Sequence, residues 1–203
     1  LDNAGNRAAT AAAVDNGSSD NCGINSLGLS QTTFTCSHVG PNTVTLTATD
    51  ANTNTATCVA TVTVADTVAP AAQCQNITVY LDNAGNGSTT AAAVDNGSSD
   101  NCGINSLGLS QTNFTCSHVG PNTVTLTVTD LYNNVGTCTA TVTVLDTINP
   151  TVVCIANQTK STDPGVCTYT VPGTAFQPVS YGDNCGQTTL QNNINQTPSL
   201  AGA

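Results

Sequence analysis

The sequence predicts an all-β protein made of tandem immunoglobulin-like β-sandwich domains, and three observations support this. Leu1 and Leu81 each begin the sequence LDNAGN, and residues 1–66 differ from residues 81–146 at 12 positions, which indicates an internal repeat of 80 residues. Residues 123–130 and 137–144 alternate β-branched and small side chains with a period of two, as half-buried strands do. All 12 acidic residues are Asp, which favours turns, whereas Glu favours helices.

Two linkers that contain proline mark the predicted boundaries between repeats. They read ADTVAP and LDTINP and end at Pro70 and Pro150, and proline is confined to strand starts and junctions because it cannot donate to a β ladder. We therefore expect a first repeat at 1–66 that lacks its first strand, a complete repeat at 67–146, and a divergent repeat at 147–203 that lacks its last strands. On this interpretation the chain is a window on a longer polymer.

The complete repeat contains about seven short segments that read as strands, which is the number expected of an immunoglobulin-like sandwich. An all-β solenoid would need a shorter period, about 20–30 residues. The segments alternate with turns such as DNAGN and with the hairpin at 131–136. The variation of this hairpin between repeats indicates either recognition of a partner or tolerance in an exposed turn, and we favour tolerance. In chain order the expected strands are 74–81, 87–94, 104–110, 113–116, 123–130 and 137–144, and residues 117–122 lead into the long strand at Thr123.

Charge and composition exclude several classes of function. Arg7 and Lys160 are the only Arg and Lys residues and the net charge is −10, which argues against binding to nucleic acid or to an anionic membrane. No apolar run is long enough to span a bilayer. No motif of a nucleophile, a catalytic acid–base pair or a phosphate loop is present, and His38 and His118 are two copies of one loop residue, so we predict that the protein is not an enzyme. Ten cysteines indicate an oxidising, extracellular compartment.

The block VGPNTVTLTVTD followed by GTCTATVTVLDTINP, with DNCG upstream, resembles the hyalin-repeat (HYR) domain family. The resemblance extends over all three repeats and is weaker in the third. It implies an immunoglobulin-like fold and an extracellular, adhesive protein. The tandem arrangement resembles that of very large surface proteins of Bacteroidetes-type bacteria.

Four cysteines in the complete repeat allow three pairings, and the sandwich topology favours one of them. The first and last strands run side by side in such a sandwich, which pairs Cys74 with Cys138. The remaining pairs are then Cys102 with Cys116, Cys22 with Cys36 and Cys167 with Cys185. Two cysteines are left over: Cys58 and Cys154. Their partners lie in a longer polymer or, alternatively, Cys154 of one chain meets Cys58 of another through a donated strand.

The repeated loop VDNGSSDNCG suggests a metal site. In an immunoglobulin-like sandwich this loop and the last hairpin lie at the pole where the chain enters, so we expect Asp66, Asp95, Asp100 and Asp130 to converge. Ca²⁺ takes about 6–8 oxygen ligands from carboxylates, amides and carbonyls, and Asn96, Ser99, Asn101 and Asn133 are further candidates. The alternative is that each Asp forms a solvated turn, which is also our interpretation of the LDNAGN turn. The full set of candidate ligands is Asp15, Asp20, Asp50, Asp66, Asp95, Asp100, Asp130, Asp146 and Asp183.

These observations predict a structural segment of an extracellular filament, stalk or adhesin shaft, with Ca²⁺ at the joints and other copies of the repeat protein as partners. The alternative is a carbohydrate- or protein-binding module of a secreted multidomain protein, for which surface glycans are candidate ligands. Thr67 and Thr147 follow Asp and precede an apolar residue, a pattern that resembles the O-glycosylation site of Bacteroidetes, so they are candidate sugar carriers.

Overall fold

The computed structural model describes residues 1–159, 161, 163–165 and 178–186. These residues form an all-β structure, as the sequence predicts, with two α-helices of one turn each. No helix within these ranges is long and apolar enough to cross a membrane. The chain divides into two compact units. The first comprises Leu1–Ile77, Thr90–Thr112 and Thr123–Thr141, and the second comprises Thr78–Thr89, Asn113–Asn122 and the described residues from Val142 onward.

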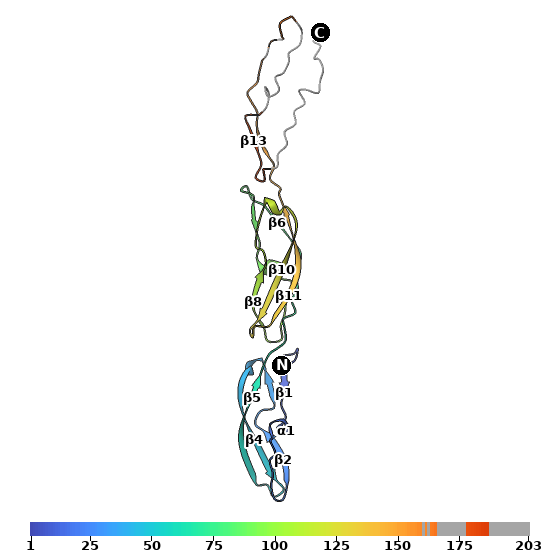
Figure 1. Cartoon of the computed structure of the whole chain (residues 1–203), viewed down its shortest axis with the longest axis vertical. Helices are drawn as coiled ribbons and strands as arrows, with labels where there is room; N and C mark the ends of the chain where they lie inside the picture. Colours follow the sequence, from blue (N-terminus) through green and yellow to red (C-terminus); the bar gives the residue numbers. More distant parts are fainter. Residues whose placement is uncertain (160, 162, 166–177, 187–203) are drawn as a thin grey trace. The chain divides into compact units, whose positions relative to one another are not determined.

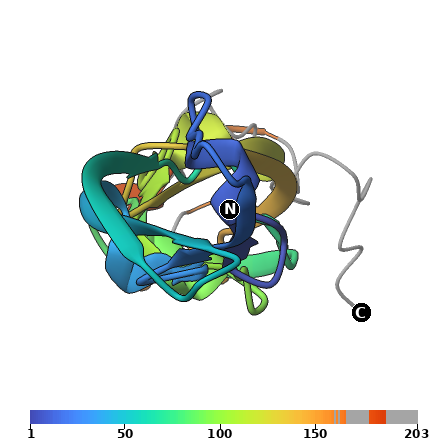
Figure 2. The same cartoon turned by 90° about the horizontal axis from the view of Figure 1, so that it is seen from below.

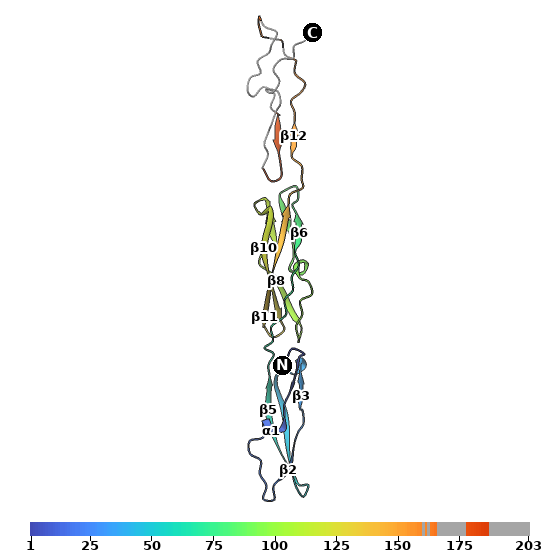
Figure 3. The ribbon, with the colours of Figure 1, turned by 90° about the vertical axis from the view of Figure 1, so that its right-hand side faces the viewer.

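The first repeat has two antiparallel sheets. A three-stranded sheet has the order β2-β4-β5, and β1 pairs with β3 in a second sheet. Strands β3 and β5 lie on opposite sides of this repeat (Figure 3), and Figure 2 shows its blue and teal segments end-on. The strands are β1 (Asn6–Ala8), β2 (Ile24–Leu29), β3 (Thr33–Thr35), β4 (Gly40–Asp50) and β5 (Thr55–Val64).

The core of the first repeat contains buried residues from β3, β4 and β5. Phe34 from β3, Val44 from β4 and Val64 from β5 are buried against one another. On β4 the buried residues Val44, Leu46 and Asp50 share one face, with the half-buried Ala48 between them, because successive side chains of a strand point to opposite faces. The period-two pattern therefore fixes which face of each strand enters the core.

The second repeat has the same plan with one additional strand. Its main sheet has the order β6-β11-β10-β8 (Figure 1), and β7 pairs with β9. Residues Ala71 and Cys74 of the entering segment add isolated β-bridges to Ser99 and Asp95. The strands are β6 (Ile77–Tyr80), β7 (Asn86–Ser88), β8 (Ile104–Leu109), β9 (Asn113–Thr115), β10 (Gly120–Asp130) and β11 (Val135–Leu145).

The strand expected at 87–94 differs from the structure. Strand β7 ends at Ser88, and Ala91–Val94 form the short helix α2. Three consecutive alanines favour a helix over a strand, and the side chain of Thr90 caps this turn by accepting a hydrogen bond from the Ala93 backbone N–H at 3.3 Å. The same sequence in the first repeat forms α1 (Ala11–Val14).

In the third repeat, β12 (Thr151–Val153) and β13 (Ser180–Gly182) pair in an antiparallel ladder (Figure 3). The rest of that repeat's expected strands, together with Cys167, lie outside the described residues.

Candidate metal sites

Three of the four carboxylates expected to converge do so. Asp66, Asp100 and Asp130 each present a carboxylate oxygen within 4.8 Å of the other two. Asp66 is 6% exposed and Asp130 is fully buried. All three belong to the first compact unit. Like charges at such separations, partly removed from water, repel one another strongly, so this arrangement is costly unless a cation or protons offset the charge.

The position of Asp130 follows from the period of β10. Val124, Leu126 and Val128 point into the core and are fully buried, and Asp130 is the next inward-facing position. The ladder with β8 also shifts register between Thr129 and Asp130, which is typical of a β-bulge. The last inward-facing residue of β10 therefore places the carboxylate of Asp130 at the end of an apolar core.

The oxygens of Asp130 are already hydrogen-bonded. Its Oδ1 accepts from the backbone N–H groups of Tyr132 and Asn134, both at 2.8 Å, and its Oδ2 accepts from Asn134 Nδ2 at 2.7 Å. Burial raises the pKa of Asp130, but these hydrogen bonds more than offset burial, and its pKa lies below the usual value. Asp130 therefore carries its negative charge at neutral pH inside the cluster.

Asp66, Asp100 and Asn101 have buried oxygens of a different kind. Asp66 Oδ1 accepts from Asn101 Nδ2 at 3.1 Å, and Asp100 Oδ2 accepts from the Cys102 N–H at 2.8 Å. The other oxygens, Asp66 Oδ2, Asp100 Oδ1 and Asn101 Oδ1, are buried and find no hydrogen-bond donor among the described residues. A buried acceptor without a partner is costly, so these three atoms point to an occupant that accepts electron pairs.

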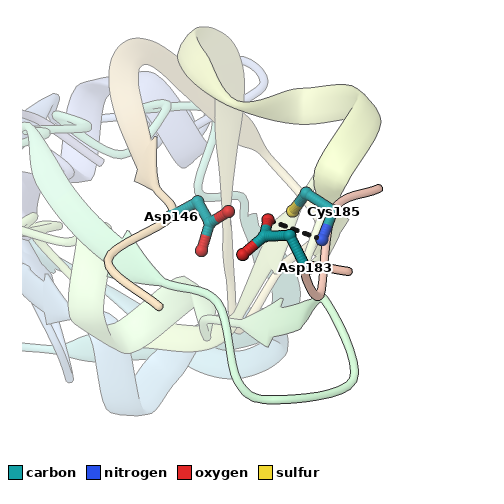
Figure 4. Close-up of side chains that lie close together, drawn as sticks. All are labelled: Asp146, Asp183 and Cys185. Carbon is teal, nitrogen blue, oxygen red and sulfur yellow. Dashed lines mark hydrogen bonds between the residues drawn. The ribbon is translucent and has the colours of Figure 1, made fainter. Parts of the chain in front are cut away.

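A second cluster repeats this pattern in the second compact unit. The carboxylates of Asp146 and Asp183 face one another beside Cys185 (Figure 4). Cys185 is bonded to Cys116, so its sulfur is not available as a thiolate ligand. The atoms of this cluster that could bind a metal are therefore oxygens. Asp183 Oδ2 accepts from the Cys185 N–H at 3.2 Å, the dashed line in Figure 4. Asp183 Oδ1 is buried and again has no donor in the described part of the chain.

The two clusters share a linker aspartate, a loop aspartate and the asparagine that follows it, whereas Asp130 belongs to the first cluster alone among the described residues. Asn184 Nδ2 donates to Asp146 Oδ1 at 3.0 Å and to the Asp82 carbonyl at 3.1 Å, just as Asn101 Nδ2 donates to Asp66 Oδ1 and to the Asp2 carbonyl. Asn184 Oδ1 is buried without a donor from any described residue. The divergent third repeat therefore reproduces the arrangement built by the nearly identical first and second repeats.

The LDNAGN turn contributes to these clusters through its backbone. Asp82 Oδ1 accepts from the N–H groups of Ala84 and Asn86, both at 2.9 Å, so its side chain forms a turn, as the sequence analysis expects. Its carbonyl, by contrast, accepts from Asn184. The turn thus fixes the amide that faces the cluster, a role that its side-chain pattern does not reveal.

The disulfides differ from the predicted pairing. Cys74 is bonded to Cys138, as expected. The predicted pairs Cys22–Cys36 and Cys102–Cys116 are wrong, because Cys36 is bonded to Cys102 and Cys116 to Cys185. The latter bond also contradicts Cys167–Cys185. Within the described residues, the free cysteines are Cys22, Cys58 and Cys154.

The physical reason for the different pairing is that the Cys-Ser-His turn of one repeat lies against the Asp-Asn-Cys loop of the next. Cys36 Sγ is 3.4 Å from the carbonyl of Asn101, and Cys116 Sγ is 3.5 Å from that of Asn184. Each of these disulfides therefore joins two successive repeats directly beside a carboxylate cluster.

Gly5 allows this close approach. Its φ is +72°, and a Cβ on it would lie 2.8 Å from Cys36 Sγ and 3.0 Å from the Asn101 carbonyl oxygen. Holding alanine in the left-handed region costs roughly 1–3 kcal/mol. We expect Gly5→Ala to lower the free energy of unfolding by more than this, because the new methyl group would also collide with Cys36 and Asn101. Gly17→Ala is the matched control, because Gly17 has φ +96° and no atom lies within 4 Å of the place that its new methyl group would take. Equal losses of stability in urea denaturation of the two variants would contradict this packing argument.

Asp95 does not join the cluster. Its carboxylate accepts from the Ser98 hydroxyl and backbone N–H and from the Gly97 N–H, and Asp15 does the same with Ser18 and Gly17. Asp20 and Asp50 likewise cap local backbone groups, and neither joins a carboxylate cluster in the described residues. For these four residues the structure fits the alternative of turn formation.

We expect Ser98→Ala to raise the pKa of Asp95. The hydrogen bond from the Ser98 side chain is the largest cause that holds the pKa of Asp95 below its usual value. Because the folded pKa is lowered, this carboxylate stabilises the fold above its unfolded pKa of about 3.9, and the stabilisation is lost as pH falls through the folded pKa. Carbon-13 NMR titration of the carboxylate measures the shift, with Asp50, held by Asn54, as the internal reference. An unchanged Asp95 titration would contradict the assignment.

The four further residues predicted to supply oxygen ligands occupy different environments in the structure. Asn101 faces the cluster, whereas Asn96 and Ser99 pair with the entering segment through their backbone. Asn133 occupies a left-handed position with φ +70°. Asn134 was not among the predicted residues, and its Nδ2 also donates to the Asp66 carbonyl at 3.2 Å. The spacing D-x-x-x-N, shared by Asp2, Asp50, Asp82 and Asp130, is the signal that would have found it.

The variable hairpin also has a role that the sequence analysis missed. The hydroxyl of Tyr132 donates to the Cys36 carbonyl at 2.8 Å. The corresponding residue of the first repeat is Asn52. The second repeat therefore makes a hydrogen bond beside the disulfide through Tyr132, where the first repeat has Asn52.

The oxygen atoms that could act as metal ligands fit a hard divalent cation. Among the described residues, the buried side-chain atoms without a hydrogen-bond partner are all carboxylate or amide oxygens. Ca²⁺ prefers such ligands, whereas zinc and copper favour sulfur or imidazole. Asp66, Asp100 and Asn101 would hold the ion in the first cluster, and Asp146, Asp183 and Asn184 in the second. A bound cation would supply the positive charge that offsets the clustered carboxylates.

Comparisons with known proteins give no family assignment. No protein-family model and no curated protein matches the sequence. Among solved structures, the chain is similar to the protocadherin gamma B7 extracellular cadherin domains 1–4, with 14% identity over 70% of this chain and 47% of that one and a TM-score of 0.33. It is also similar to the protocadherin gammaB4 extracellular domain, with 19% identity over 66% of this chain and 28% of that one and a TM-score of 0.34. The chain spans less than half the length of either structure.

Proposed function

We propose that this chain is a structural segment of an extracellular filament, stalk or adhesin shaft, in which Ca²⁺ and disulfides stiffen the joints between repeats. The observation that carries the proposal is the set of buried oxygens without hydrogen-bond donors in the described residues, which recurs at two successive joints. A structural role fits because the same contacts recur where the third repeat has diverged in sequence.

The proposal assigns each joint two kinds of connection. A disulfide joins the repeats covalently, and three disulfides in the described residues fit an oxidising compartment. The cation adds a shared ligand set, since Asp66 belongs to the linker and Asp100 to the next repeat's loop. Removing the ion would leave the disulfide intact but restore the repulsion between carboxylates, so the joint would loosen without separating.

We further propose that copies of this protein associate with one another in adhesion and that the repeats belong to the hyalin-repeat family. We also propose that Thr67 and Thr147 carry sugars. Thr67 and Thr147 are exposed, which a sugar carrier requires. Each stands directly after the linker aspartate of a cluster, so a sugar there would lie beside the joint.

Pulsed electron spin resonance tests the proposed stiffening. Spin labels on the exposed Cys22 and Cys154, in a Cys58→Ser/Cys167→Ser background, report the distribution of distances between them. We expect a narrow distribution with Ca²⁺ and a broader one with EGTA, because the ion fixes the joints. A distribution that does not change with EGTA would contradict the proposed role of calcium.

A further inference from the structure

The Cys36–Cys102 disulfide and the first carboxylate cluster connect the same two repeats. The disulfide joins the Cys-Ser-His turn of the first repeat to the Asp-Asn-Cys loop of the second. The cluster joins Asp66, which follows strand β5 of the first repeat, to Asp100 in that same loop. All of these residues belong to the first compact unit. Two connections that close one joint are coupled, because each holds in place the groups that the other must bring together.

A first route between the disulfide and the cluster runs along the Asp-Asn-Cys loop. The Cys102 N–H donates to Asp100 Oδ2 at 2.8 Å, and Cys36 Sγ lies 3.4 Å from the Asn101 carbonyl oxygen. Asp100 Oδ1 and Asn101 Oδ1 are buried and have no donor among the described residues. The same holds for Oδ2 of Asp66, a residue that is 6% exposed. Two of the three candidate ligands therefore stand directly before the bonded cysteine, and the disulfide limits how far they can move.

A second route runs through Tyr132. Its hydroxyl donates to the Cys36 carbonyl at 2.8 Å, and its backbone N–H donates to Asp130 Oδ1, also at 2.8 Å. Asp130 is fully buried and lies within the cluster. The turn that carries Cys36 is therefore connected to the hairpin that carries Asp130, independently of the loop.

The other disulfide of this compact unit is connected differently. Cys74 of the entering segment is bonded to Cys138 of β11. Cys74 also forms a β-bridge with Asp95, and Asp95 belongs to no carboxylate cluster in the described part of the chain. The Cys74–Cys138 bond is therefore an internal reference for a disulfide that is remote from the candidate metal ligands.

We propose that the first cation site and the Cys36–Cys102 disulfide form a redox-sensitive switch, in which a dithiol that opens the disulfide weakens Ca²⁺ binding. This inference rests on the proposed calcium site. Ca²⁺ in turn makes the disulfide harder to reduce, because the two effects express one coupling free energy and are reciprocal. Contacts that position the ligands of a metal site typically change metal affinity by about 10–100-fold, and we expect a coupling of about tenfold.

The reduction balances as a thiol–disulfide exchange. A thiolate of the dithiol attacks one sulfur of the protein disulfide, and the other sulfur leaves as a thiolate with the electron pair of the broken bond. The second thiolate of the dithiol then attacks its own bonded sulfur, which closes a ring disulfide and releases the second cysteine. Two electrons and two protons thus pass from the dithiol to Cys36 and Cys102.

Redox titration of the full chain tests the switch. The chain is equilibrated with mixtures of reduced and oxidised dithiothreitol, in Ca²⁺ or in EGTA, and mass mapping after alkylation gives the reduced fraction of each disulfide. To prevent exchange with other thiols, the chain carries Cys22→Ser, Cys58→Ser, Cys154→Ser and Cys167→Ser.

We expect the equilibrium constant for reduction of Cys36–Cys102 to be about tenfold smaller in Ca²⁺, which corresponds to a reduction potential lower by about 30 mV. The constant for Cys74–Cys138 should not change. Equal constants for Cys36–Cys102 in Ca²⁺ and EGTA would overturn the switch. An equal shift of both disulfides would also overturn it, because a general stabilisation by Ca²⁺ would then explain the result.

Tyr132→Phe tests the second route without changing a disulfide or a candidate ligand. The variant loses the hydroxyl that donates to the Cys36 carbonyl and keeps the backbone N–H that donates to Asp130. We expect the Ca²⁺-dependent shift of Cys36–Cys102 to fall to about threefold, as the loss of one hydrogen bond predicts. An unchanged shift would overturn the route through Tyr132.

Calcium affinity separates this inference from the proposed site itself. Isothermal calorimetry compares the native chain with Cys36→Ser/Cys102→Ser and with the control Cys74→Ser/Cys138→Ser, and circular dichroism verifies that each variant is folded. We expect about tenfold weaker binding at one site in the first variant and unchanged binding in the control. Equal affinities in all three proteins would overturn the switch and leave the calcium site in place. Absence of binding by the native chain would overturn both.

Discussion

Asp100→Asn is expected to abolish the stabilisation of the first compact unit by Ca²⁺. The buried Asp100 Oδ1 has no donor within the described structure, and an amide at this position removes one of the charges that hold the ion. At a Ca²⁺ concentration 100-fold above the dissociation constant, binding contributes about 2.7 kcal/mol to the native state. Most of that contribution should disappear in calorimetric melting of the variant.

The sign of the effect should reverse without calcium. Asp66, Asp100 and Asp130 lie within 4.8 Å of one another, so the neutral amide also removes repulsion between carboxylates. In EGTA the variant should therefore melt above the native protein, and in Ca²⁺ below it. Asp20→Asn is the matched control, because Asp20 holds the same place in an identical loop but joins no carboxylate cluster in the described residues. A variant that melts below the native protein in both conditions would contradict the metal site.

Loss of the Cys36–Cys102 disulfide is expected to destabilise the first compact unit strongly. The bond joins residues 66 apart in the sequence, and a loop of this length predicts a loss of about 4 kcal/mol through the entropy of the unfolded chain. Replacing both cysteines by serine avoids a new free thiol. The measurement is urea denaturation without reductant.

Cys22→Ser serves as the control for this disulfide. Cys22 stands at the same place in the repeated loop as Cys102 but is free and exposed, so its replacement should change the unfolding free energy little. If the double serine variant is as stable as Cys22→Ser, the Cys36–Cys102 bond does not form in the native protein.

The sequence predicts the fold well because its signals are local. The alternation of β10 places Val124, Leu126 and Val128 in the core without any knowledge of the partner strands. The exception, Ala91–Val94, is also local, since three alanines and the cap from Thr90 outweigh the expectation of a longer strand.

The disulfides could not be predicted in the same way because repetition makes the choices equivalent. Cys22 and Cys102 stand in identical loops, so the sequence around Cys36 does not distinguish a partner in its own repeat from one in the next. The decision depends on which loop lies against the Cys-Ser-His turn, and that is a tertiary contact. Gly5 is a local sequence feature that reflects this contact, because a glycine leaves room for Cys36 beside Asn101.

The candidate metal sites lie between these two cases. Convergence of Asp66, Asp100 and Asp130 follows from the order of loops in a sandwich, and the structure places them together. Asp95 was included wrongly, because its own Ser98 provides a closer partner. Asn184 was not singled out, since only the three-dimensional match to Asn101 reveals its orphan oxygen.

Direct titration of the metal-free protein with Ca²⁺ by isothermal calorimetry tests the central claim, which is that a cation occupies each joint. The account predicts that Asp100→Asn removes one equivalent of bound Ca²⁺, that Asp183→Asn removes one, and that the double variant removes two. A native stoichiometry that persists in the double variant, or no binding by the native protein, would contradict the claim.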